Sequence, residues 1–220
     1  MSQKQIAVIG LGRFGSSVAL TLQNMGHEVL GIDQDQDVVD HFADELTHAV
    51  VCESTDEDSL KALGLRNFDV AIVAIGNDVQ ASILTTVILK EMGVPVVVAK
   101  ALSELHGRTL AKVGADRVIY PERDMGVRVA HQLTSPNLLD YIELSKQYTI
   151  AEMTVPDCLS GKSLANVNPR GRFGCSVVAI NKTKGIVIAP NAEDVLNEKD
   201  VMVVIGTNEQ IEQFQQSIRR

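Results

Sequence analysis

The stretch Ile6-Ala-Val-Ile-Gly-Leu-Gly-Arg-Phe-Gly15 joins a short apolar run to the glycine spacing G-x-G-x-x-G. A strand that leads through this spacing into a helix is typical of the first turn of a dinucleotide-binding fold. Gly10 permits the tight turn, Gly12 lets the backbone approach a pyrophosphate, and Gly15 lets the helix pack close to the strand. The stretch therefore predicts a helix N-terminus that receives phosphate.

An acidic residue stands at the distance from this stretch that the fold requires. Asp33 ends the second predicted strand, 18 residues after Gly15, close to the usual spacing of about 20. Its carboxylate can accept hydrogen bonds from both hydroxyls of a ribose. Gln34 and Asp35 offer no Arg for a 2′-phosphate, which argues against NADP. A Rossmann fold that has lost its ligand is the alternative interpretation.

Apolar runs alternate with amphipathic segments from residue 5 to about residue 134. The runs contain little besides Val, Ile and Ala, as expected of strands buried on both faces. This alternation predicts an α/β fold, a doubly wound parallel Rossmann sheet with right-handed crossovers. The predicted strands are Ile6–Ile9, Val29–Ile32, Ala49–Cys52, Val70–Ile75, Val96–Ala99 and Val118–Tyr120. Glycines at the predicted helix ends are Gly26, Gly64, Gly93 and Gly114.

The pattern changes after about residue 134. Ser135-Pro136-Asn137 is expected to end a helix that starts near Asp124, because Pro cannot continue the backbone ladder. Short turns separate the later runs, which predicts a small α+β domain closed by an amphipathic helix over Glu209–Ile218. We therefore predict a nucleotide-binding domain over residues 1–134 and a smaller domain over residues 137–220. The later strand-like runs are Tyr141–Leu144, Ile150–Val155, Ser176–Ile180, Ile186–Ala189 and Val201–Ile205.

Composition argues against several classes of protein. The 220 residues carry 20 Lys and Arg against 28 Asp and Glu, a formal charge of −8, and only 4% are aromatic. Without a basic surplus or stacking platforms, nucleic-acid binding is not expected. The three cysteines fit neither a zinc pattern nor a CxxC motif, which favours a reducing, cytosolic compartment. The longest apolar runs are as short as strands, so no membrane-spanning helix is expected. Any role at a membrane is expected from the aqueous side.

Two charged residues near the predicted phosphate site have alternative interpretations. Arg13 lies inside the glycine loop, where it can face a further phosphate charge or reach across a dimer interface, or remain solvated. Glu122 follows the sixth predicted strand and would repel phosphates unless a divalent cation lay between them. Its alternative is a loop ion pair with Arg123 or Arg117, and Asp124 can cap the next helix.

Further candidates follow the other predicted strands, at the edge of the sheet where ligands bind in this fold. Lys100 can reach a phosphate, and Asn77 can contact the nucleotide. Residues 53–55 lie where an adenine is expected, although a capping role would explain them equally well. These remaining candidates for cofactor binding are Phe14, Glu53, Ser54, Thr55, Ile75, Gly76, Asn77 and Lys100.

The nucleotide site is not matched by a reaction site. A dehydrogenase brings a base and a substrate clamp to the nicotinamide, whereas residues 137–220 contain no His and no obvious catalytic pair. We therefore expect sensing, not enzymatic turnover. A small NAD-dependent oxidoreductase is the alternative, and a DNA-binding redox sensor is disfavoured by the charge.

These motifs together resemble the regulator-of-potassium-conductance (RCK, or KTN) domain. The similarity covers essentially the whole chain and is greatest to the cytosolic gating subunits of bacterial Ktr potassium uptake systems. The second half resembles the RCK C-terminal (TrkA-C) domain more loosely. The motifs that carry the resemblance are the glycine stretch with Ala74–Gly76, Gln80–Thr86, Lys112–Asp116 and Pro121–Gly126, and then Arg170–Gly174, Ala189-Pro190 and Glu198–Gly206.

The resemblance implies a functional assembly. Homodimers would form an octameric ring beneath a membrane potassium-translocating subunit, so the protein would be cytoplasmic and peripheral to the inner face of the membrane. ATP and ADP would compete for the Rossmann site, with ATP favouring the active ring, and NAD(H) is associated with related domains. In several relatives the C-terminal domain binds cyclic di-AMP, for which Arg170 is the candidate residue here.

The resemblance also assigns roles in the nucleotide site. Asp33 would hold the ribose, and the three glycines of the loop, Gly15 included, would hold the phosphates. Arg13 would contact the γ-phosphate across the dimer. Glu122 would help coordinate a divalent cation, Mg²⁺ or Ca²⁺, at that interface.

Overall fold

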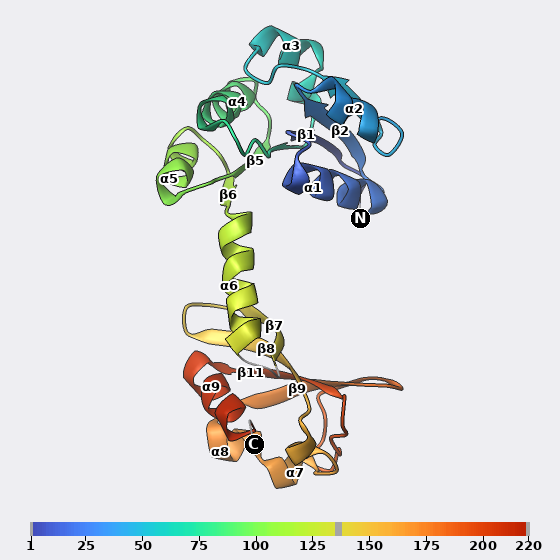
Figure 1. Cartoon of the computed structure of the whole chain (residues 1–220), viewed down its shortest axis with the longest axis vertical. Coiled ribbons are helices and arrows are strands. Elements are labelled where there is room, and N and C mark those ends of the chain that lie inside the picture. Colours follow the sequence, from blue (N-terminus) through green and yellow to red (C-terminus); the bar gives the residue numbers. More distant parts are fainter. Residues whose placement is uncertain (1, 135–137, 219–220) are drawn as a thin grey trace. The chain divides into compact units, whose positions relative to one another are not determined.

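The computed structural model describes residues 2–134 and 138–218. The chain divides into two compact units, Met1–Arg123 and Asp124–Arg220 (Figure 1). The boundary thus falls inside helix α6 (Pro121–Thr134) and not after residue 134 as predicted. Most of α6 belongs to the second unit because Arg128 bonds to Asp140 and Gln132 to the carbonyl of Leu139. The predicted helix stop at 135–137 lies outside the described residues.

Helix α6 begins earlier than predicted. Its first residue is Pro121, whose fixed φ and missing N–H suit the first position of a helix. Asp124 therefore lies inside the helix, and its predicted role as a cap is wrong. Glu122 consequently belongs to the first turn of α6 and not to a loop.

The first unit is the predicted doubly wound fold. All pairs in its six-stranded sheet are parallel, and the strand order β3-β2-β1-β4-β5-β6 reverses between β1 and β4. Its elements are β1 (Gln5–Ile9), α1 (Arg13–Asn24), β2 (Glu28–Asp33), α2 (Gln36–Phe42), β3 (His48–Val51), α3 (Glu57–Ala62), η1 (Leu65–Asn67), β4 (Val70–Val73), α4 (Val79–Glu91), β5 (Val96–Lys100), α5 (Glu104–Lys112) and β6 (Arg117–Ile119).

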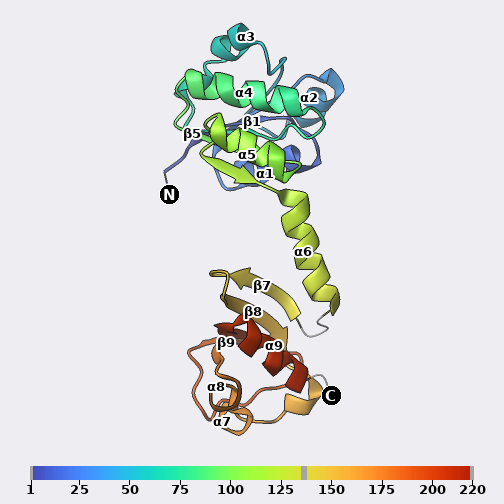
Figure 2. The same ribbon diagram turned by 90° about the vertical axis from the view of Figure 1, so that its left-hand side faces the viewer.

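Helices cover both faces of this sheet, which explains its unbroken apolar strands (Figure 2). Alternate residues of β1 enter different cores: Ala7 and Ile9 pack with α3, α4 and α5, and Ile6 and Val8 pack with α1. Side chains that alternate across a strand and find an apolar layer on either side leave no position for a polar residue.

The helix ends follow the sequence signals. The predicted terminal glycines all have positive φ: Gly26 (85°), Gly64 (70°), Gly93 (83°) and Gly114 (108°). Helices α2 to α5 start at side chains that accept a hydrogen bond from the first turn, namely Asp35, Asp56, Asp78 and Ser103. Helix α1 differs, since Gly12 at its start provides no such bond and its first turn contains no acidic residue.

The second unit is the predicted small α+β domain. Its five strands form an antiparallel sheet in the order β10-β9-β11-β8-β7. The closing helix packs Ile211, Phe214 and Ile218 into the core, as its periodicity predicts. The elements that complete the unit are β7 (Leu138–Glu143), β8 (Tyr148–Thr154), η2 (Asp157–Leu159), α7 (Leu164–Val167), α8 (Pro169–Phe173), β9 (Ser176–Lys182), β10 (Gly185–Ile188), β11 (Val201–Thr207) and α9 (Asn208–Ser217).

Within the described residues, none of the helices has the length and apolar character needed to cross a membrane.

Candidate nucleotide-binding site

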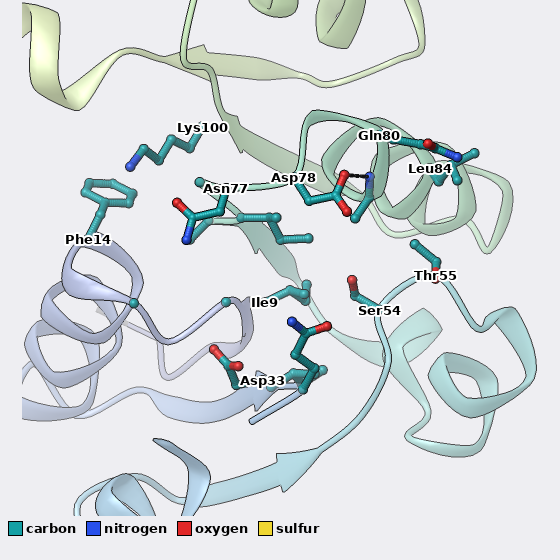
Figure 3. A pocket seen from close by; sticks show the side chains of 18 of the residues that line it. Ile9, Phe14, Asp33, Ser54, Thr55, Asn77, Asp78, Gln80, Leu84 and Lys100 are labelled. Carbon is teal, nitrogen blue, oxygen red and sulfur yellow. Dashed lines mark hydrogen bonds between the residues drawn. The ribbon is translucent and has the colours of Figure 1, made fainter. Parts of the chain in front are cut away.

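A pocket of about 990 Å³ opens at the carboxyl ends of the parallel strands, where the strand order reverses (Figure 3). Ligands of doubly wound proteins bind at this position. All lining residues belong to the first unit, and they include every predicted cofactor-binding residue except Gly15. They are Ile9, Gly10, Gly12, Arg13, Phe14, Ile32, Asp33, Gln34, Cys52, Glu53, Ser54, Thr55, Ala74, Ile75, Gly76, Asn77, Asp78, Gln80, Ala81, Leu84, Lys100, Leu102 and Glu122.

The three glycines of the loop have different reasons to be glycine. Gly10 has a φ of 93°, a conformation that other residues rarely adopt. A Cβ on Gly15 would lie 1.8 Å from the carbonyl oxygen of Gly10, so its role is close packing of α1 and not contact with the pocket. A Cβ on Gly12 would meet nothing within 4 Å, and its φ of −64° suits any residue. Neither the backbone conformation nor the packing of the protein therefore requires a glycine at position 12. A ligand that lies against the backbone there would require one.

The start of α1 faces this pocket with its first N–H groups uncapped by any described side chain. Free N–H groups and the positive end of the helix dipole favour an anion. The neighbouring helices of the sheet satisfy the same groups with Asp or Ser. Among α1 to α5, the start of α1 is therefore the one suited to an anion such as phosphate.

Asp33 ends β2 and lines the pocket, as the spacing predicted. Its Oδ2 accepts a hydrogen bond from the N–H of Leu11 at 2.7 Å, and its Oδ1 accepts one from the N–H of Asp35 at 3.1 Å. The carboxylate thus also orders the glycine loop. Because each carboxylate oxygen has two acceptor positions, both oxygens can still receive a hydroxyl.

Lys100 and Glu122 form an ion pair in the wall of the pocket, with Nζ and Oε1 2.6 Å apart. The predicted partners of Glu122 were Arg117 and Arg123, but Arg123 pairs with Glu104. The hydrogen bond from Lys100, aided by the charges of Lys100 and Arg13, holds the pKa of Glu122 below its ordinary value. Glu122 is therefore an ionised carboxylate beside the predicted phosphate site.

The loop after β3 forms another wall, where Ser54 and Thr55 lie away from Phe14 and Lys100 (Figure 3). Glu53 accepts hydrogen bonds from the backbone and hydroxyl of Thr55 at 3.3 and 3.1 Å. The hydroxyl of Thr85 in α4 donates to the carbonyl of Ser54 at 3.0 Å. The cap of α3 is Asp56, so the predicted capping role of residues 53–55 is wrong. The bonds give the loop a structural role, and contact with an adenine stays a prediction.

Sequence reasoning did not place the first turns of α4 in the site. Gln80, Ala81 and Leu84 line the pocket, together with Leu102 after β5 and Cys52 after β3. The sequence signal that would have found them is their position in the segments that follow strand ends. In the structure two apolar members of the set remain exposed, Leu84 at 42% and Leu102 at 47%. Burial, and then the nearby Asp56 and Glu53, raise the pKa of the Cys52 thiol, which keeps it protonated.

The described residues contain no group of three or more His, Cys, Asp or Glu side chains that could hold a metal ion by itself. A divalent cation in the pocket would therefore need oxygens from a ligand besides those of the protein. Magnesium commonly binds in this way, through one or two carboxylates plus phosphates. Arg170, the candidate for a second ligand, lies in α8 of the second unit and is exposed.

Comparison with known proteins agrees with the two-unit division. Residues 6–121 match the TrkA-N domain and residues 150–219 match the TrkA-C domain. Among solved structures, the GsuK RCK domain has a TM-score of 0.53 and 27% identity, over 98% of this chain and 46% of that one. A GsuK channel bound to NAD has a TM-score of 0.52 and 25% identity, over 99% and 39%. This chain thus spans less than half of those longer chains.

Curated relatives match over nearly their full length. The chain is 45% identical over 216 residues to the Ktr system potassium uptake protein C of Bacillus subtilis (strain 168), which is 98% of each chain. It is 44% identical to the Ktr system potassium uptake protein A of the same organism, over 98% of this chain and 97% of that one. The chain therefore belongs to the family of the Ktr system potassium uptake proteins, with a TrkA-N domain followed by a TrkA-C domain.

Proposed function

We propose that this chain is the nucleotide-binding regulatory subunit of a membrane potassium transporter, and not an enzyme. The observation that carries the proposal is the pocket in front of the uncapped α1, in a chain 45% identical to a Ktr system potassium uptake protein. The subunit would act from the cytoplasm, held at the membrane through its partner. Ligand binding would shift the population of its conformations, as far as the ligand binds them with different affinity.

ATP and ADP are the proposed ligands. Asp33 would accept the ribose hydroxyls, and the turn at Gly12 with the start of α1 would hold the phosphates. NAD(H) would use the same groups, and the similar GsuK channel was solved bound to NAD. We favour ATP and ADP because the pocket also contains Arg13 and Lys100, two cations suited to further phosphate charge.

Arg13 is the proposed sensor of the third phosphate. ATP and ADP differ by one charged phosphate, so only a group that interacts with that phosphate can make one conformation bind ATP better than another. Arg13 is the first residue of α1 and lines the pocket. In a homodimer its guanidinium would reach the γ-phosphate held by the partner. Glu122 and the phosphates would share a Mg²⁺ or Ca²⁺ ion, whose charge offsets their repulsion.

Assembly into homodimers and an octameric ring completes the proposal. Helices α5 and α6 carry large apolar side chains on the surface of the single chain, of which Leu105 is 67% and Met125 53% exposed. Exposed apolar groups of this kind favour contact with another subunit. The ring would bind a membrane potassium-translocating subunit. In the second unit, Arg170 remains our candidate for cyclic di-AMP.

A small NAD-dependent oxidoreductase is the alternative function. It would require a proton-transferring group and a substrate clamp beside the nicotinamide. Histidine, the commonest such base, is not among the described residues that line the pocket. Sustained absorbance change at the nicotinamide wavelength with a panel of alcohols and hydroxy acids would revive this alternative.

The proposed role of Arg13 is tested by measuring ATP and ADP binding to Arg13→Ala by calorimetry with Mg²⁺ present. Loss of a charge-assisted contact to one phosphate should weaken ATP binding by about tenfold or more, and leave ADP within about threefold. Arg66→Ala removes the same charge from an exposed position in η1 and should change neither affinity. Equal losses for both nucleotides would contradict the role. Light scattering of the ATP-bound wild type should give the mass of a ring.

A further inference from the structure

The ion pair between Lys100 and Glu122 is asymmetric. The Lys100 side chain is only 9% exposed, whereas that of Glu122 is 66% exposed. Lys100 lies at the end of β5, with Nζ 5.7 Å from the centroid of the Phe14 ring. It also lies close to Gly76, since a Cβ there would be 3.4 Å from Nζ. The cation is therefore fixed between α1 and the loop after β4, and the anion reaches it from the solvent side.

This asymmetry makes the carboxylate the replaceable partner. A buried ammonium is costly without an anion, so Lys100 retains a strong demand for negative charge. An exposed carboxylate recovers its hydration when it leaves, which makes its departure inexpensive. Lys100 lines the same pocket as Gly12 and Arg13, where phosphate is expected. A terminal phosphate that enters from the pocket can satisfy Lys100 in place of Glu122.

We propose that Glu122 is a built-in competitor for the terminal phosphate of the nucleotide: it holds Lys100 in the ligand-free protein, and the γ-phosphate must displace it. This inference rests on the proposed binding of ATP and ADP. Displacement releases a carboxylate next to the phosphate, available to a divalent cation. The exchange is between anions, because the hydrogen bond from Lys100 keeps the pKa of Glu122 below its ordinary value and the carboxylate ionised.

The experiment measures ATP and ADP affinities of the full chain by calorimetry, with EDTA present so that no cation bridges Glu122 and phosphate. Glu122→Gln keeps the shape of the side chain but frees Lys100, and should tighten ATP binding by about tenfold. ADP affinity should change by less than about threefold. Glu104→Gln removes the same charge from an exposed ion pair with Arg123, outside the pocket, and should leave both affinities unchanged.

Simple charge repulsion between Glu122 and phosphate is separated from competition by a double-mutant cycle with Lys100→Met. Competition predicts that Glu122→Gln tightens ATP binding more when Lys100 is present than when it is Met. Repulsion predicts the opposite, because Lys100 partly neutralises Glu122 in the wild type. Matching melting temperatures would show that the variants are folded.

The outcomes distinguish the two proposals. Wild type that binds neither nucleotide, both with EDTA and with Mg²⁺ present, would overturn the proposed function and this inference together. Wild type that binds ATP, combined with a Glu122→Gln variant that binds it no tighter or with the opposite sign in the cycle, would overturn the competitor role alone.

Discussion

The two ends of the parallel sheet both carry lysine–carboxylate ion pairs and glycines, but these residues have different roles at each end. At the carboxyl end of β5, Lys100 pairs with the exposed Glu122 in the wall of a pocket. At the amino end, Lys90 pairs with Asp116 at 2.8 Å, and Asp116 also accepts the N–H of Val97 at 2.7 Å. Glu122 thus has a lysine as its partner, whereas Asp116 bonds both to a lysine and to the backbone of β5.

The glycines differ between the two ends as well. Gly26, Gly64, Gly93 and Gly114 end helices at the amino end, each with the positive φ that such an end requires. At the carboxyl end Gly12 has an ordinary φ and open space around it. The amino end of the sheet thus satisfies its own backbone and charges. The carboxyl end leaves the N–H groups at the start of α1 uncapped and pairs its buried lysine with an exposed carboxylate.

The largest effect is expected from Gly15→Ala. The new Cβ would lie 1.8 Å from the carbonyl oxygen of Gly10, so α1 would have to move away from the sheet. We expect the free energy of unfolding to fall by at least about 3 kcal/mol, measured by urea denaturation. Gly126→Ala, in α6 with nothing within 4 Å, is the control and should not destabilise. Equal stability of Gly15→Ala and wild type would refute the close contact.

The second largest effects are expected from alanine substitutions of one glycine at each end of the sheet, Gly12 at the carboxyl end and Gly26 at the amino end. Gly12→Ala places a methyl group where phosphate is expected, and should weaken ATP binding by about tenfold with stability unchanged within about 0.5 kcal/mol. Gly26→Ala, at a φ of 85°, should instead lower the free energy of unfolding by about 1 kcal/mol and leave ATP affinity intact. Calorimetry and urea denaturation of both variants measure the two effects. If Gly12→Ala lost stability but not affinity, the glycine would serve the fold.

The smallest effect concerns the ion pair at the amino end. Asp116→Asn should lower the free energy of unfolding by only about 1 kcal/mol at pH 7, because the Lys90–Asp116 pair is partly exposed and screened by solvent. The hydrogen bond from Lys90, and then that from Val97, lower the pKa of Asp116 in the folded protein. Its stabilisation is therefore complete above the unfolded pKa of about 3.9 and disappears as the pH falls through the lower folded value.

Urea denaturation of wild type and Asp116→Asn at several pH values tests this assignment. The difference in unfolding free energy should be constant from pH 7 to about pH 5 and shrink below about pH 4. ATP affinity at pH 7 should not change. A difference that grew on acidification would mean that the folded protein raises the pKa of Asp116.

Local patterns were enough for most of the fold. The apolar runs correspond to the strands of both sheets. Four glycines end their helices as predicted: Gly26, Gly64, Gly93 and Gly114. These features depend on neighbours in the chain, through burial on both faces and the φ angle that glycine allows. Helix α6 starts at Pro121, before the predicted start near Asp124, because the missing N–H of a proline costs no hydrogen bond at the first position of a helix.

The sequence by itself determined that β1 leads through Gly10 and Gly12 into a helix that can hold phosphate, and that Asp33 stands at the end of β2. Those relations span few residues. Only the tertiary structure decided that Lys100, not Arg117 or Arg123, is the partner of Glu122. The two residues meet because β5 lies beside β6 in the sheet, and α6 begins directly after β6. Burial of one charge and exposure of the other, on which the exchange depends, likewise arises from packing between elements distant in the chain.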